Sequence, residues 1–245
     1  MKKIITLFSL MLCLFATAQE AVDTMYIYRN DNIIERIPVS KIDSVVFVQP
    51  AVPETQYEAV DLGLSVKWAT MNVGATSPED YGGYYAWGET EEKDNYDWST
   101  YKWCNGSYDT QTKYCTDSYY GTVDNKTVLD PEDDVAQVKW SGSWRMPTKA
   151  EQDELRTNCT WTWTTQNGVN GYKVTGPNGN SIFLPAAGYR FGSEVYYRGS
   201  YGYYWSSSLS SSNNGYACNL YFDSGRYDWN LSSRCSGLSV RPVSD

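Results

Sequence analysis

The segment from residue 189 to residue 241 constrains the chain most, because it almost lacks Lys and Glu, which usually cover much of a protein surface. Its 53 residues include 13 Ser, 9 Tyr, 6 Gly and 4 Asn, but no Lys and only one Glu, so Tyr and small polar residues must supply the surface. Tyr offers a large amphipathic contact area with only two rotors to freeze, while Ser, Gly and Asn offer adaptable hydrogen bonds. This mixture predicts a recognition surface on a folded domain. The alternative is an all-β end whose exposed loops recognise nothing.

The same segment carries the alternation of a half-buried strand. Alternate positions of residues 216–222 are Tyr, Cys, Leu and Phe, the positions between them are mixed, and a turn at residues 223–226 leads to a returning strand. We expect ligand contacts from the exposed residues of this region, which are Tyr196, Tyr197, Arg198, Tyr201, Tyr203, Asn213, Asn214, Tyr216, Tyr221, Arg226, Tyr227, Asp228, Trp229 and Asn230. Trp205 and the ring of Tyr204 fit the core equally well.

Residues 1–18 are typical of a secretory signal peptide. Two lysines precede an apolar run over residues 4–15, which is too short to span a bilayer, and Ala16 and Ala18 are small residues at the −3 and −1 positions of a cleavage site. Leu12 before Cys13 is not the small residue that a lipid anchor requires. We therefore expect export to the cell surface or the medium, without a lipid and without direct membrane insertion.

The charge balance disfavours nucleic acid and anionic membranes as partners. Loss of Lys2 and Lys3 with the leader leaves 18 basic against 29 acidic side chains, a net charge of −11. Both kinds of partner require Lys and Arg to neutralise phosphate groups, which a surface this acidic provides poorly.

Five cysteines remain after cleavage, in a compartment where disulfides form. The preferred pairs are Cys104–Cys115 and Cys218–Cys235, each closing a short polar loop, with Cys159 buried and free. Five cysteines allow 15 choices of two pairs, so other pairings stay open. The chain has no His and no CxxC spacing, which excludes a zinc site built from His and Cys. We expect no cofactor.

The chain divides into a small β appendage with a linker, residues 19–55, and a main domain, residues 56–245. Two β-prone runs flank a polar turn at residues 29–32 and predict a hairpin, and residues 42–48 predict another strand. Residues 49–55 carry two prolines and no pattern, which indicates a linker. The appendage is too short for a core of its own.

Two helix starts stand out in the main domain. Asp130, followed by Pro131 and three acids, predicts an N-cap with a helix behind it, although four carboxylates in five residues also leave Ca²⁺ binding open. Thr148 and Glu151 form a capping-box pattern, which predicts a short helix ending near Asn158.

The other elements are predicted to be irregular or extended. Residues 89–121 are acidic, aromatic and patternless, so this long insertion needs tertiary packing, and a disulfide could help to hold it. Residues 161–164 and 171–175 flank Asn167-Gly168 and predict a hairpin. Residues 238–243 predict a closing strand, and Pro242 places the end of that strand at an edge or beyond the ladder.

Several motifs in order resemble a known family. They are VDLGLSVKWAT (60–70), YGGYYAWGET (81–90), WRMPT (144–148), LPAAGYR (184–190), YWSS (204–207) and SVRPV (239–243). Residues 57–244 thus resemble the Fibrobacter succinogenes major paralogous domain, which is similar to the C-type-lectin-like fold shared with formylglycine-generating enzymes. The region around residues 42–47 resembles a leader found before secreted domains of gut Bacteroidetes. Met71 stands where the family pattern leads us to expect Cys.

The resemblance implies a fold class and a type of protein. The class is α+β: a C-type-lectin-like domain with short helices, small antiparallel sheets and long irregular loops, in which the first and last strands pair. Family members are mostly secreted or surface proteins. The Glu-Pro-Asn motif of lectin sugar sites is absent, so that site does not carry over. The composition of residues 191–234 is also compatible with a segment diversified by adenine-directed mutagenesis, as in some C-type-lectin-like proteins.

Three functions compete on these grounds. The leading one is a secreted or cell-surface recognition or adhesion protein that binds a glycan or a surface protein. The second is a structural subunit of a surface assembly, with residues 19–55 adding a strand to a partner's sheet. An enzyme is the least favoured, because no carboxylate pair is singled out for glycoside hydrolysis and a chain without His cannot form a Ser-His or Cys-His pair.

Overall fold

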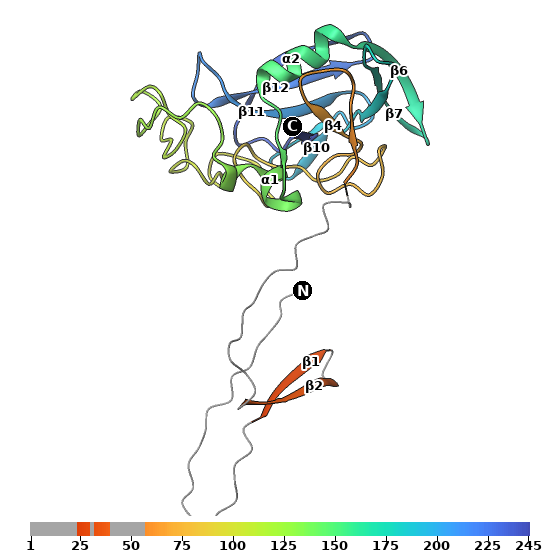
Figure 1. The fold of residues 1–245 in the computed structure, drawn as a ribbon. Coiled ribbons are helices and arrows are strands. Elements are labelled where there is room, and N and C mark those ends of the chain that lie inside the picture. The colour runs from red at the N-terminus through yellow and green to blue at the C-terminus, as the bar shows by residue number, and fades with distance from the viewer. Residues whose placement is uncertain (1–23, 30–31, 40–56) are drawn as a thin grey trace, which may run out of the picture. The chain divides into compact units, whose positions relative to one another are not determined.

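The computed structural model describes residues 24–29, 32–39 and 57–245, and the chain divides into two compact units at residues 50 and 51. In the first unit, β1 (Thr24–Arg29) pairs antiparallel with β2 (Asn32–Pro38), which confirms the two predicted strands (Figure 1). The predicted leader, the turn residues 30–31, the strand at 42–48 and the linker at 49–55 lie outside the described residues.

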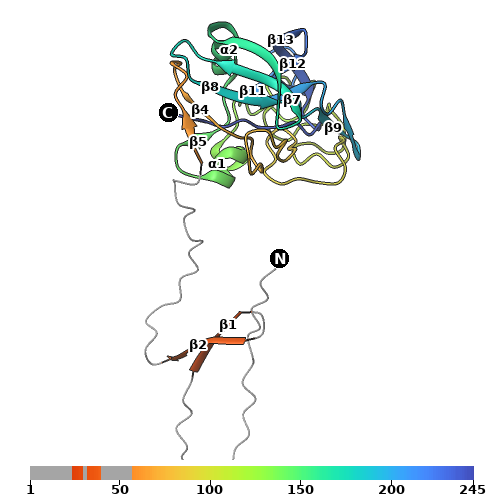
Figure 2. The same cartoon turned by 90° about the vertical axis from the view of Figure 1, so that its right-hand side faces the viewer.

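Residues 57–245 form small antiparallel sheets with few helices, an arrangement consistent with an α+β or a mostly β class. One sheet has the order β3-β4-β14-β5 and another the order β6-β7-β8; β9 pairs with β10, and the last sheet has the order β11-β12-β13. Figure 2 shows this unit from a second side. The strands of the first sheet are β3 (Ala59–Val60), β4 (Lys67–Ala69), β5 (Trp144–Arg145) and β14 (Val243–Ser244).

The first sheet joins the beginning of this unit to its end. In β14, Val243 pairs with Trp68 of β4 on one side and with Arg145 of β5 on the other. The first strand, β3, pairs with β4, so the last strand meets the second strand rather than the first. The closing strand is shorter than predicted, because residues 238 and 239 form only isolated bridges to Tyr85 and Tyr204.

The capping box at Thr148 is confirmed. Helix α2 (Lys149–Asn158) begins behind it: the Thr148 hydroxyl accepts from Glu151 N–H, and the Glu151 carboxylate accepts from Thr148 N–H at 2.7 Å. The helix ends at Asn158, as predicted, and packs against β11–β13. Within the described residues, no helix is both long and apolar enough to cross a membrane.

The predicted helix start at Asp130 and Pro131 is confirmed, but the capping role predicted for the Asp130 side chain is wrong. Its side chain makes no capping bond to the short 3₁₀ helix η3 (Pro131–Asp133), and Asp134 instead caps α1 (Val135–Trp140) by accepting from Ala136 N–H at 2.9 Å. Asp130 and Asp133 each lie 2.6 Å from the Lys113 ammonium. An ion pair with a nearby lysine stabilises a carboxylate more than the partial positive charge at the start of a short helix does.

The predicted hairpin at residues 161–175 is confirmed. Strand β6 (Thr160–Gln166) and strand β7 (Val169–Thr175) flank Asn167 and Gly168, whose φ angles of 49° and 84° are those of a type I′ turn. Strand β8 (Ser181–Pro185) completes this sheet.

The insertion at residues 89–121 is irregular, as predicted, and contains no helix and no named strand. The predicted disulfides are wrong, since all five described cysteines are free, and Cys159, predicted to be buried, is only half-buried. Packing holds the insertion instead: the buried Arg234 guanidinium lies among the rings of Trp87, Tyr101 and Tyr114. Trp205 and Tyr204 belong to the core, with 0% and 1% of their surface exposed.

Candidate ligand-binding surface

Six tyrosine rings from four strands and one loop form a continuous array, which we call the tyrosine surface. Its members are Tyr189, Tyr196, Tyr197, Tyr201, Tyr203 and Tyr221. They come from β9 (Tyr189–Phe191), β10 (Glu194–Tyr196), the loop at residues 197–201, β11 (Gly202–Leu209) and β12 (Tyr216–Asp223). Five of the six are residues that the sequence predicted for ligand contact.

Strand register produces the two ends of this array. Tyr189 and Tyr196 are directly opposite in the β9–β10 pair, and their ring centroids lie 5.5 Å apart in a stacked arrangement. Tyr203 and Tyr221 are directly opposite in the β11–β12 pair, with ring centroids 5.1 Å apart. Directly opposed aromatic residues stabilise antiparallel strands, so the same contacts support the sheet and align the rings.

The loop between the two strand pairs closes the array. The rings of Tyr197 and Tyr201 meet edge to face at 4.8 Å, and the ring of Tyr189 meets that of Tyr203 at 5.1 Å. Tyr197 has a φ angle of 57°, which side chains other than Gly rarely adopt, and its carbonyl accepts from both Ser200 N–H and Tyr201 N–H at 3.0 Å. Such a conformation persists only where its surroundings determine it, and it therefore indicates a fixed orientation for this ring.

Exposure differs along the tyrosine surface. Tyr197 is 54% exposed and Tyr196 39%, whereas Tyr221 is 8% exposed. The Tyr221 hydroxyl donates to the Asp223 carboxylate at 2.7 Å, but within the described residues the other five hydroxyls have no protein partner. Burial raises the pKa of Tyr189, Tyr203 and Tyr221, so these hydroxyls stay protonated at neutral pH and can both donate and accept.

Charged groups lie at one side of the array. The Arg226 guanidinium lies over the Tyr221 ring at 4.9 Å, and its Nε is 3.5 Å from the Asp223 carboxylate. The hydrogen bond from Tyr221 holds the pKa of Asp223 below its ordinary value, so this carboxylate is ionised. Arg198 turns away from the array and donates to the Tyr84 hydroxyl at 3.2 Å.

A hollow of about 500 Å³ shares Tyr201 with the tyrosine surface. It is lined by Trp163, Asn170, Gly199, Ser200, Tyr201, Asp223 and Ser224. Asn170 holds the loop in place by donating to the Gly199 carbonyl at 3.1 Å, and it keeps a second amide N–H for other partners. The hollow therefore combines two aromatic side chains with a carboxylate, an amide and hydroxyls, a lining suited to a polar ligand that also presents apolar faces.

The structure places three predicted contact residues away from the tyrosine surface. Asn213 and Asn214 lie in the turn before β12, and Tyr216 begins that strand. Asn214 is 3% exposed, and its Oδ1 accepts from Thr116 N–H at 2.7 Å, so it has no free surface for a ligand. Tyr216 is 37% exposed and is a suitable control residue.

The predicted residues of β13 (Arg226–Ser233) have separate surroundings. The Tyr227 ring stacks on that of Trp161 with centroids 4.6 Å apart, a packing contact. Trp229 is 45% exposed beneath the Lys149 ammonium. Asp228 and Asn230 use their Oδ1 atoms to accept the N–H groups of the residues that follow them, at 2.8 Å.

Sequence reasoning missed Tyr189 of the tyrosine surface and six lining residues of the hollow, which are Trp163, Asn170, Gly199, Ser200, Asp223 and Ser224. Tyr189 begins the Tyr-rich segment, so the composition of that segment could have included it. Trp163 and Asn170 belong to the β6–β7 hairpin, whereas Asp223 ends β12, so only tertiary packing brings these segments together.

Comparison with known proteins adds one finding. Residues 147–243 match the family model described as "Domain of unknown function (DUF8237)", and this stretch contains the whole tyrosine surface and the hollow. No curated protein and no solved structure matches the chain.

Proposed function

We propose that this chain is a secreted or cell-surface recognition protein that binds a glycan through the tyrosine surface and its adjoining hollow. The observation that carries the proposal is the array of six touching rings, most of which keep hydroxyls without protein partners. Aromatic faces stack on the C–H faces of sugar rings, while the phenol, amide and carboxylate groups match sugar hydroxyls. A surface protein is the second possible ligand.

Rigidity supports the proposal. The hydrogen bonds at Tyr197 and the Asn170–Gly199 contact order the loop before any ligand arrives, so binding would pay little entropy for ordering it.

The resemblance to the Fibrobacter succinogenes major paralogous domain and to C-type-lectin-like folds enters here as part of the proposal. Its support is the combination of small antiparallel sheets, short helices, the long irregular segment at residues 89–121 and the β4–β14 pairing between the two ends of the domain. Export by the leader at residues 1–18 is likewise proposed, on the sequence pattern alone.

The experiment is a binding screen of the secreted chain against glycans and surface proteins, with and without EDTA. A glycan retained by the wild type should be lost by the double variant Tyr197→Ala, Tyr201→Ala and kept by Tyr216→Ala, whose ring lies outside the array. Retention of a protein ligand with the same variant pattern would keep the surface and change the ligand class. Equal loss in Tyr216→Ala would argue against the tyrosine surface.

A second role is favoured by the β1–β2 pair. A two-stranded sheet is only marginally stable alone. Pairing one edge of β1–β2 with a partner's sheet would add hydrogen bonds and stabilise it. Deletion of residues 19–55 should then abolish attachment to a surface assembly and leave glycan binding unchanged.

A further inference from the structure

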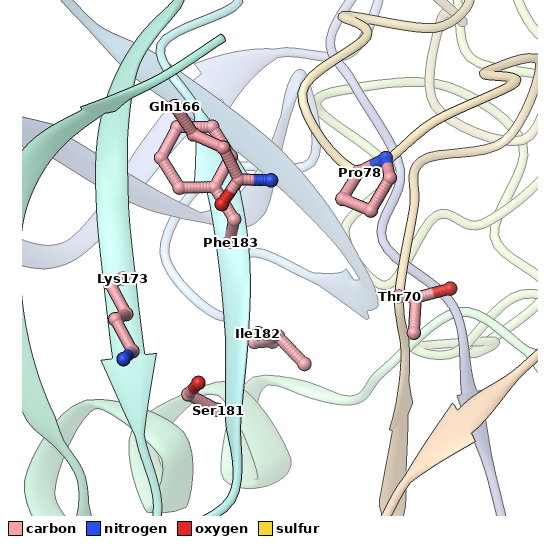
Figure 3. Close-up of a pocket in the computed structure, with 7 residues that line it drawn as sticks. All are labelled: Thr70, Pro78, Gln166, Lys173, Ser181, Ile182 and Phe183. Carbon is pink, nitrogen blue, oxygen red and sulfur yellow. The ribbon is translucent and has the colours of Figure 1, made fainter.

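A second recess lies on the sheet formed by β6, β7 and β8, apart from the residues that form the tyrosine surface (Figure 3). Its volume is about 290 Å³, and it is lined by Thr70, Pro78, Gln166, Lys173, Ser181, Ile182 and Phe183. Figure 3 shows β8 running through the middle, with Lys173 on one side and Thr70 and Pro78 on the other.

The strand register decides which side chains share this recess. Lys173 is directly opposite Phe183, and Thr175 is directly opposite Ser181, so Lys173, Phe183 and Ser181 project from one face of the sheet. The Phe183 ring lies against Gly171, where a Cβ atom would be 2.8 Å from its Cζ. The Phe183 side chain is buried at this position, with 4% of its surface exposed, whereas the Lys173 side chain is exposed.

Three polar groups of the recess lack protein partners among the described residues. Within the described residues, the Lys173 ammonium, the Ser181 hydroxyl and the Thr70 hydroxyl have no hydrogen-bond partner. Six other lysines of residues 57–245 pair with carboxylates, and among these residues only Lys67 shares the unpaired state of Lys173. An ammonium without a carboxylate partner is unexpected beside this recess, because the chain has 29 acidic but only 20 basic side chains.

The free edge of β8 adds a backbone donor. The Phe183 carbonyl accepts from Arg241 Nη2 at 2.9 Å, so it points away from β7. The N–H and the C=O of one residue in an antiparallel ladder point to the same side, and the Phe183 N–H therefore also points away from β7. That is the side on which Thr70 and Pro78 lie.

These groups suit a ligand with one negative charge on a ring that carries hydroxyl groups. Lysine supplies a single point charge, whereas a phosphate dianion is usually met by several cations or by a row of backbone N–H groups. The hydroxyls and the Gln166 amide match ligand hydroxyls, and the partly exposed Pro78 offers an apolar wall. Glu79 accepts from Gln166 and Asn167, and these hydrogen bonds keep its pKa low, so the ligand's carboxylate belongs at the Lys173 end.

We propose that this recess binds a carboxylated monosaccharide, with its carboxylate on Lys173 and Ser181 and its ring against Pro78. The test is a calorimetric or NMR titration of the whole chain with galacturonate, with galactose as the uncharged match and acetate as the bare carboxylate. Galacturonate should bind more tightly than either, and its affinity should fall as salt is added.

The deciding variants are Lys173→Gln and its control Lys67→Gln. Loss of a charge-assisted contact predicts an affinity about tenfold weaker in Lys173→Gln, while Lys67→Gln should match the wild type. Equal binding of galactose, equal binding of acetate, or equal losses in both variants would each overturn the proposal. The Tyr197→Ala, Tyr201→Ala variant should keep galacturonate binding, which separates this site from the tyrosine surface.

Discussion

Replacement of Arg234 by Met should destabilise the fold strongly. Arg234 is 0% exposed and has no carboxylate partner among the residues that the structure describes. Its guanidinium donates to the carbonyls of Lys113 at 2.9 Å, Asn214 at 3.0 Å and Tyr114 at 3.1 Å, and to the Tyr101 hydroxyl at 2.9 Å. This one side chain thereby ties the irregular insertion to the turn before β12.

The four acceptors of the Arg234 guanidinium determine how much stability the Met variant should lose. Met keeps most of the apolar stem of Arg234 but leaves three carbonyls without this donor, and each buried group left unsatisfied costs about 1–3 kcal/mol. Relaxation and entry of water reduce the sum, so we expect a loss of about 3–5 kcal/mol in the free energy of unfolding. Loss of the cation from its three aromatic rings acts in the same direction.

The assay is chemical denaturation of the wild type, Arg234→Met and the control Arg226→Met, followed by Trp fluorescence. The Arg226 side chain is 70% exposed, so its replacement should change stability by no more than about 0.5 kcal/mol. Limited proteolysis should also cut the insertion faster in Arg234→Met. A loss below about 1 kcal/mol in that variant would refute the reasoning that unsatisfied carbonyls dominate.

Three further predictions concern single features of the fold. Thr148→Ala removes the capping box and should cost about 1 kcal/mol of stability by denaturation, with Thr148→Ser close to the wild type. Gly188→Ala should lower the melting temperature strongly, because the new Cβ would lie 2.0 Å from the Tyr196 carbonyl oxygen, whereas Gly179→Ala meets no atom within 4 Å and should cost less. Burial raises the pKa of Tyr204, so the folded state holds this proton more tightly than the unfolded state; the resulting stability is complete below pH of about 10 and is lost as pH rises further, which an alkaline titration at the phenolate absorbance can follow.

Local signals explain what could be predicted from the sequence. Asn167-Gly168 can adopt the two left-handed conformations of a type I′ turn, and Thr148 with Glu151 can satisfy the first N–H groups of a helix, so each signal needs only neighbours in the chain. The exposed tyrosines of residues 196–203 were identified from composition, because a segment without Lys must place Tyr at its surface.

The failures concern contacts between distant segments. Asp130 fits an N-cap pattern, but the position of Lys113, 17 residues earlier, determines what the carboxylate binds. The sequence around Tyr227 predicts a ligand contact, but in the structure the Tyr227 ring stacks on that of Trp161. The cysteine pairs were chosen for short loops, and loop length says nothing about whether the two side chains face each other.

The central claim is that the tyrosine surface contacts the ligand, and NMR of the chain labelled in its tyrosine rings tests it most directly. A glycan retained in the binding screen would be titrated into the protein while each ring resonance is followed. We predict that the rings of Tyr196, Tyr197 and Tyr201 shift together at one apparent affinity, while the ring of Tyr216 does not. Shifts confined to Tyr216, with the other three rings unchanged, would contradict the claim.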